Sequence, residues 1–424
     1  MPEIAEAQAL LAALSSADEV NVEAARRQRM TQLQAAYGAA LIAARGFGAP
    51  ETTEAFARAR ESAASNDSLQ RLAADYGLWA GSYVRGDLPA MKAQAAAFLA
   101  DVAAKPDSGE AGIAHRVQGM THLFAGEFVE AARELELALA RFEPGRDDDL
   151  GVRFPPDPGA AAMIYLAFAS WALGEFGQAA SLIERMRARV EGLSHATTLA
   201  HATALTAFFA LMRGDHSQAE TSVSELARIV RDHELPLFRT ISEFLVGWAD
   251  AEGGSLAEGL AAMRRGVESL RAQNAVVFDG IIKIALAEAE ARAGDPERAL
   301  AVLDEALATC ERTSGRAFEC ELHRARGDIL PKCDPTNPAP AEDAFTTAIA
   351  LAKRQGARGY QLLASLALAK LYRTTSRLFE AHALLAPELE GFSPTPEMPE
   401  IAEAQALLRA LNGSSIAAGL LGGV

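Results

Sequence analysis

The hydrophobic positions of this chain recur with the period of an α-helix. In DPERALAVLDEALATCE, residues 295–311, apolar side chains fall at positions i, i+3, i+4 and i+7, which places them on one face of a helix. The alternation of apolar and polar residues that is typical of strands is absent from the sequence. The pattern therefore predicts an all-α protein built from amphipathic helices.

The helical segments repeat with a period of about 40 residues. Glycines typical of turns stand 40, 48, 40, 40 and 40 residues apart, at Gly86, Gly126, Gly174, Gly214, Gly254 and Gly294. Gly46 continues this phase towards the N-terminus, and the last unit has Ser376 at the turn. Self-similarity of this kind indicates a repeat architecture in which each unit packs on its neighbours.

Small and large residues occupy fixed places around each turn. The residue five positions after the turn glycine is small: Ala131, Ala179, Ala219, Gly259 and Ala299. The residue nine positions after it is large and apolar: Leu135, Ile183, Val223, Met263 and Leu303. Small residues let two antiparallel helices approach closely, and large ones fill the groove to the next unit. The sequence thus predicts a right-handed α-solenoid of stacked antiparallel helix hairpins.

The two ends of the chain share one sequence. MPEIAEAQALL occupies residues 1–11 and returns unchanged at 398–408, and each copy carries an apolar stripe at helical spacing. A helix of about 14 residues is marginal alone in water, so each copy has to dock on the array or on another chain. A homo-oligomer formed through the terminal helices is one hypothesis.

These features divide the chain into four predicted parts. They are an N-terminal helix at 1–18, a repeat array at 19–397 with an irregular, exposed loop at 143–158, a capping helix at 398–411, and a flexible tail at 412–424. The capping helix is expected to bury Ile401, Ala404, Leu408 and Leu411 against residues 377–390.

The order of small residue, glycine turn, alanine and large residue resembles the tetratricopeptide repeat, whose period is shorter, near 34 residues. A narrower resemblance is carried by residues 114–180, which begin AHRVQGMTHLFAGEFVEAARELELALARF, and by residues 40–61 and 323–387. These segments look like the repeat region of bacterial class III adenylate cyclases that carry an AAA-type ATPase module. The resemblance implies the regulatory part of such a protein, and the chain departs from the family because it has neither a cyclase nor an ATPase module.

Charge and composition narrow the classes of partner. The chain has 40 Lys and Arg against 56 Asp and Glu, a net charge of −16, which disfavours nucleic acid or an anionic membrane as the main partner. The longest apolar stretch, residues 159–174, is shorter than the roughly 20 residues that a membrane helix needs. The start lacks the features of a secretory signal, and three cysteines fit a reducing compartment, so we expect a cytoplasmic protein.

The sequence contains no motif that predicts a catalytic, cofactor-binding or metal-binding site. A phosphate loop of the type GxxxxGK[ST] is absent, and no strands are predicted to hold the paired aspartates of a cyclase. The aspartates at 147–149 lack the spacing of a calcium loop, which favours a solvated loop. The cysteines are interpreted as buried or half-buried thiols rather than zinc ligands, and four histidines as groove-lining or core residues: His115, His122, His195 and His201.

The function that these patterns favour is a non-enzymatic scaffold whose concave face, lined by the first helix of each hairpin, binds a peptide or protein segment in signalling. Candidate groove contacts on first helices are Arg116, His122, Arg239 and Lys283. Two alternatives remain open. The chain could be a regulatory subunit or fragment of an adenylate cyclase or ATPase, or the sensor region of a transcription regulator.

Overall fold

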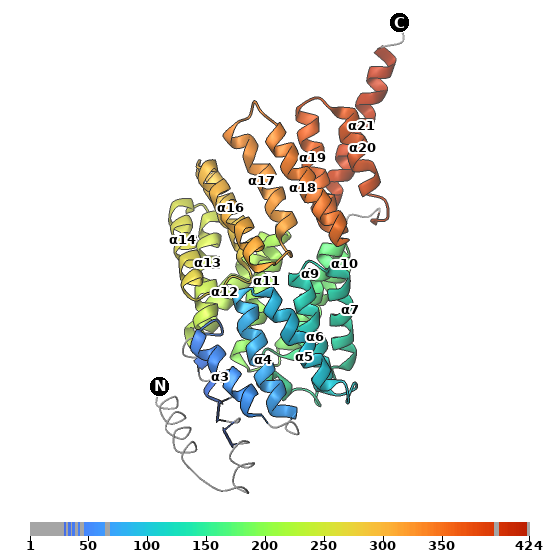
Figure 1. Ribbon diagram of the computed structural model, residues 1–424. Coiled ribbons are helices and arrows are strands. Elements are labelled where there is room, and N and C mark those ends of the chain that lie inside the picture. The colour runs from blue at the N-terminus through green and yellow to red at the C-terminus, as the bar shows by residue number, and fades with distance from the viewer. Residues whose placement is uncertain are drawn as a thin grey trace.

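The computed structural model describes residues 46–63, 68–393 and 398–421, together with scattered positions between 29 and 42. The predicted N-terminal helix at 1–18 lies outside these residues. Within the described part of the chain every regular element is a helix, and successive helices pack as antiparallel hairpins (Figure 1). The prediction of an all-α solenoid is therefore confirmed.

The helices keep the labels of Figure 1 and form eight hairpins from α4 to α20, with α8 inside an insertion. Their bounds are α3 (Pro50–Ser62), α4 (Ser68–Arg85), α5 (Leu88–Val102), α6 (Gly109–Phe124), α7 (Phe128–Arg141), α8 (Leu150–Arg153), α9 (Pro158–Leu173), α10 (Phe176–Val190), α11 (Ala196–Met212), α12 (His216–Asp232), α13 (Pro236–Glu252), α14 (Leu256–Ala272), α15 (Asp279–Arg292), α16 (Pro296–Thr313), α17 (Glu319–Cys333), α18 (Ala339–Gln355), α19 (Arg358–Thr374), α20 (Leu378–Glu388) and α21 (Pro399–Leu421).

Six of the eight hairpin turns are built by a glycine and the residue that follows it; Ser376 takes the glycine's place between α19 and α20, and the connection of α17 to α18 contains no glycine. The turn glycines adopt a positive φ, for example 65° at Gly214, a conformation that residues with a side chain rarely take. The carboxylate of Asp215 then accepts a hydrogen bond from the backbone N–H of Gln218, at 3.1 Å, and caps the second helix. The Gly-Asp pair therefore ends one helix and starts the next.

The small positions bring the two helices of a hairpin into backbone contact. The alanines five residues after the turn are fully buried: Ala131, Ala179, Ala219 and Ala299. In the α13–α14 hairpin the place is taken by Gly259, where an added Cβ would lie 2.4 Å from the carbonyl oxygen of Gly247. Only a residue without a side chain fits there, which explains the spacing seen in the sequence.

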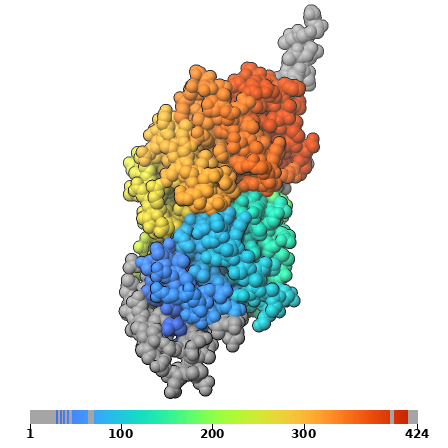
Figure 2. All heavy atoms as spheres, in the orientation of Figure 1, coloured from blue at the N-terminus to red at the C-terminus, as the bar shows by residue number. Residues whose placement is uncertain are grey.

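The solenoid winds tightly enough for one superhelical turn to contact the next. The backbone N–H of Val276 donates to the carbonyl of Val84 at 2.9 Å, and that of Arg316 donates to the carbonyl of Phe124 at 2.8 Å. Both pairs are 192 residues apart (276 − 84 and 316 − 124), which spans five hairpins. Figure 2 shows the later hairpins, in orange, resting on the earlier ones, in blue and cyan.

The insertion at 143–158 differs from the exposed, irregular loop that the sequence predicts. Residues 150–153 form α8, and Asp147, Leu150, Phe154 and Asp157 are buried, although most residues of its first half are exposed. The ring of Phe154 packs edge-on against Tyr76, with 5.4 Å between centroids. The prolines and aspartates suggested solvation, but this apolar anchor draws the second half of the insertion into the fold.

The C-terminal copy of the repeated segment lies at the end of the array. Helix α21 contacts α20 and α19 and buries Ile401, Ala404 and Leu411 as the stripe predicts, with Leu407 buried more deeply than Leu408. The helix continues to Leu421, past the expected end at 411 and into the segment expected to be a flexible tail. No proline interrupts this segment, although its glycines, serines and asparagine are poor helix formers.

Candidate functional site

The first helices of the hairpins line the inner face of the superhelix, where an apolar chamber and a charged chamber lie. The apolar chamber is bounded chiefly by rings from α4, α9, α11, α13 and α15 and by the insertion: Tyr76, Trp79, Tyr83, Pro155, Pro156, Tyr165, His201, Phe238 and Phe278. The charged chamber lies further along, between α15, α17, α19 and α21, and consists of two adjoining hollows that share Met212, Glu321 and Arg324. Glu288 lines one of them, and four further charged side chains line the other: Asp328, Lys370, Glu400 and Glu403.

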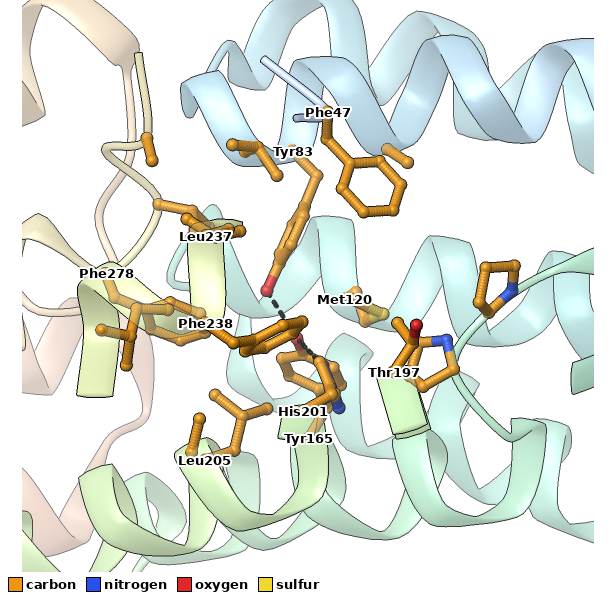
Figure 3. A pocket seen from close by; sticks show the side chains of 18 of the residues that line it. Phe47, Tyr83, Met120, Tyr165, Thr197, His201, Leu205, Leu237, Phe238 and Phe278 are labelled. Atoms are coloured by element: carbon orange, nitrogen blue, oxygen red, sulfur yellow. Dashed lines mark hydrogen bonds between the residues drawn. The ribbon is translucent and has the colours of Figure 1, made fainter. Parts of the chain in front are cut away.

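A chain of hydrogen bonds crosses the apolar chamber. The hydroxyl oxygens of Tyr83 and Tyr165 lie 2.5 Å apart, and the Tyr165 hydroxyl is 3.0 Å from Nε2 of His201 (Figure 3). The three side chains come from α4, α9 and α11, so the first helices of three different hairpins meet at this point. Trp79 stacks on Tyr83 with 5.4 Å between ring centroids and completes one aromatic wall.

The side chains of Tyr83, Tyr165 and His201 are all neutral at physiological pH. Burial, together with the positive charge of Arg116, lowers the pKa of His201 to about 3. Burial also raises the pKa of the hydroxyl of Tyr83 and that of Tyr165 above their usual value. The apolar chamber therefore offers hydrogen bonds without charge.

The charged chamber has an excess of carboxylates. Glu321, Arg324 and Asp328 share one face of α17, and the guanidinium of Arg324 donates to Glu321 at 2.8 Å and to Asp328 at 2.6 Å. Lys370 pairs with Glu403 at 2.7 Å. Five acidic and two basic side chains line the chamber, which gives it a formal charge of −3.

Glu288 and Glu400 are the two carboxylates of this chamber that form no hydrogen bond or ion pair with another described residue. The side chain of Glu288 is exposed to solvent at the edge of the hollow that it lines. Burial raises the pKa of Glu288, the charge of Arg324 opposes this, and Asp328 and Glu321 raise it further. The folded chain thus disfavours the charged form of Glu288 relative to the unfolded chain.

We expect Glu288→Gln to raise the melting temperature at pH 7 to 8, by roughly 1 °C for a chain of this size. Below the ordinary pKa of 4.5 the carboxyl is neutral in both the folded and the unfolded chain and costs no stability. As the pH rises the unfolded chain ionises first, so the wild type loses stability that the variant keeps. Calorimetry from pH 4 to 8 measures the difference, and Glu258→Gln, at an exposed position of α14, is the control. A constant offset between variant and wild type would contradict this expectation.

The four predicted groove contacts are not brought together by the fold. Arg116 is buried, with guanidinium hydrogen bonds of 2.9 Å to the carbonyls of Phe154 and Pro156. Lys283 is also buried and pairs with Asp279 and Glu305, and His122 is bonded to Glu127 at 2.5 Å. Arg239 is exposed on α13. None of the four lines either chamber, so their role as groove contacts stays a prediction.

The structure also places the cysteines and the aspartates of the insertion. Cys320 is buried, its thiol 3.2 Å from the carbonyl of Ala348, and Cys310 and Cys333 are half-buried and free. Asp147 pairs with Arg146. Among the described residues no group of three or more His, Cys, Asp or Glu side chains could hold a metal ion. No helix in the same part of the chain is both long and apolar enough to span a membrane.

Comparison with known proteins defines the fold and leaves the family open. No family model matches the chain. An uncharacterised protein of Rhizobium meliloti (strain 1021) is 27% identical over 233 residues, which is 55% of this chain and 22% of that protein. The match thus spans about a fifth of the length of that relative.

Among solved structures, a Rap protein complexed with competence and sporulation factor is similar with a TM-score of 0.51. The identity is 12%, and the match covers 82% of this chain and 98% of the other. A second solved structure is a signal transduction ATPase with a tetratricopeptide repeat sensor, from Pyrococcus horikoshii. It is 13% identical with a TM-score of 0.42, and the match covers 87% of this chain and 50% of that protein. This similarity is too low to support an argument about the fold. Fold and chambers together define an α-solenoid of tetratricopeptide-like hairpins with a hollowed inner face.

Proposed function

We propose that the chain is a non-enzymatic scaffold that binds a peptide or protein segment on its inner face. The observation that carries this proposal is the charged chamber, where five carboxylates face two basic groups and Glu288 forms no ion pair with another described residue. Because unpaired charge in an enclosed place favours a ligand of opposite sign, the segment is expected to present lysine or arginine. A cytoplasmic location and a role in signalling belong to the same proposal.

A peptide library displayed on phage and selected on the full chain tests this function. Selected peptides should be rich in Lys and Arg, and the charge reversal Glu288→Lys should weaken the binding of the best one by about tenfold or more in fluorescence anisotropy. Glu258→Lys changes the net charge equally on an outer helix and should leave the affinity within about twofold. Selection of acidic peptides, or equal loss in both variants, would contradict the proposal.

A second candidate function is the regulatory part of a longer protein. It is supported by the relative from Rhizobium meliloti, since the matched region forms only 22% of that longer protein. Under this proposal a cyclase or ATPase module would be supplied by a separate chain or by sequence outside the one printed here. A homo-oligomer formed through the terminal helices is also a proposal, and α21 would be its contact surface.

A further inference from the structure

The apolar chamber holds a hydrogen-bond chain with spare capacity in an otherwise apolar lining. Tyr83, Tyr165 and neutral His201 carry three hydrogens on oxygen or nitrogen, and the two bonds between them use two. One donor is therefore left over. In one orientation it is the N–H at Nδ1 of His201, and in the reverse orientation it is the hydroxyl of Tyr83. Neither atom has another hydrogen bond within the described residues.

This reversal determines which group fits the chain. When the free donor is at His201, Tyr83 presents a free lone pair, and when the free donor is at Tyr83, His201 presents one. The hydrogen-bonded row of three side chains can therefore donate or accept a hydrogen bond. A hydroxyl group, which both donates and accepts, matches either orientation. A charged group does not match the site. It would lose its hydration on entering the chamber, and the lining contains no residue of opposite charge to compensate for that loss.

The size and shape of the chamber limit the ligand to one ring. Its empty space measures about 830 Å³ when the part open to solvent is included, but the centre of a water molecule can reach only about 80 Å³ of it. Most of the empty space therefore lies within a water radius of the walls, and the remainder suits a small planar ring. Aromatic walls such as Trp79, Tyr83 and Phe278 offer faces and edges for a planar molecule.

The chamber can be reached without unfolding a hairpin. In Figure 3, Thr197, Leu237 and Phe238 of α11 and α13 surround the hydrogen-bond chain together with Phe47, and each of these four side chains keeps partial exposure. The deeper lining residues, such as Leu205 and Met120, are buried. The exposed group forms a rim and the buried group a floor.

We propose that the apolar chamber binds a neutral single-ring aromatic molecule bearing one hydroxyl group, a phenol, with the hydroxyl on the Tyr83–Tyr165–His201 chain. This inference does not depend on the proposed peptide-binding role, which rests on the charged chamber. The same ring occurs in the tyrosine side chain of a peptide, so the experiment compares both sources.

Calorimetric titration of the full chain with 4-methylphenol tests the proposal. Binding should be roughly tenfold or more tighter than that of 1,4-dimethylbenzene, which has the same shape but leaves the chain's donor unpaired. The fluorescence of Trp79 should change on binding because this ring stacks on Tyr83. N-acetyltyrosinamide supplies the second arm. Tighter binding of 4-methylphenol assigns the site to free phenols, and tighter binding of the tyrosine derivative assigns it to a peptide side chain.

Two threonine variants localise the binding. Thr197→Phe fills the rim of the chamber and should abolish the binding of 4-methylphenol, whereas Thr221→Phe, at an exposed position of α12, should leave it unchanged. Circular dichroism of both variants checks that they are folded. Failure of the wild type to bind 4-methylphenol, binding unchanged by Thr197→Phe, or equal binding of 1,4-dimethylbenzene would overturn the inference. None of these results would affect the test with basic peptides.

Discussion

Replacing Gly359 with alanine is expected to destabilise the chain and to open its superhelix. A Cβ atom at this position would lie 2.2 Å from the carbonyl oxygen of Trp171 and 3.0 Å from that of Ala172. Both are backbone atoms of α9, so a side-chain rotation cannot relieve the clash. Helices α9 and α19 belong to hairpins that are one superhelical turn apart, and the clash must push these turns away from each other.

Overpacking of this kind costs about 1–3 kcal/mol and occasionally more, and the rigid neighbour places Gly359→Ala at or above the upper end. Chemical denaturation should show the loss of stability, and small-angle X-ray scattering should show a larger radius of gyration. Gly192→Ala is the matched control, since no heavy atom lies within 4 Å of a Cβ built at that position. A Gly359→Ala chain as compact and stable as wild type would show that the contact between turns carries little of the fold.

The hairpins could be predicted from the sequence because their determinants are local. A positive-φ residue at the turn and a small residue five positions later act within about ten residues and recur in most units, and a capping aspartate joins them at Asp87, Asp215 and Asp295. The turn at Ser376 shows that the conformation matters more than the residue, since Ser376 adopts a φ of 61° where other units have glycine. The repeat was therefore visible without any knowledge of the tertiary structure.

The closeness of the superhelical turns could not be predicted in this way. It arises from a small rotation between hairpins that accumulates over five of them, and no short segment records it. The contact of Gly359 with Trp171 joins residues 188 positions apart (359 − 171). The same winding decides which first-helix residues face a chamber, which is why Arg116 and Lys283 looked like groove contacts and lie buried among internal partners.

Some signal for the chambers was present in the sequence. Tyr76, Trp79 and Tyr83 stand at i, i+3 and i+7 on one first helix, and Glu321, Arg324 and Asp328 have the same spacing on another. The rings indicate a face that is buried or that binds a ligand. The spacing does not predict which residues of other hairpins these rings contact. Tyr165 and His201, which complete the hydrogen-bonded row with Tyr83, come from later hairpins.

Arg116→Met is expected to release the insertion at 143–158 while leaving most of the solenoid folded. The guanidinium of Arg116 lies over the ring of Tyr76, 5.4 Å from its centroid, and holds the carbonyls of Phe154 and Pro156. Hydrogen bonds to a charged group contribute about 1.5–3 kcal/mol each, so the free energy of opening the insertion should fall by about 3 kcal/mol or more. Global stability should change less, because methionine fills the same space and removes a buried charge that no carboxylate contacts.

Limited proteolysis with trypsin separates the local effect from the global one, since the insertion itself contains Arg146 and Arg153. Cleavage follows the population of the open form when opening and closing are fast, so the Arg116→Met chain should be cut within the insertion at least about tenfold faster than wild type. Arg133→Met, which removes an exposed arginine of α7, should be cut at the wild-type rate. If instead the two variants are cut equally fast, the other contacts of the insertion retain it, such as the packing of Phe154 and the ion pair of Arg189 with Asp157, and Arg116 serves another purpose. If Arg116→Met is cut along its whole length, the arginine supports the first hairpins themselves rather than the segment that it contacts.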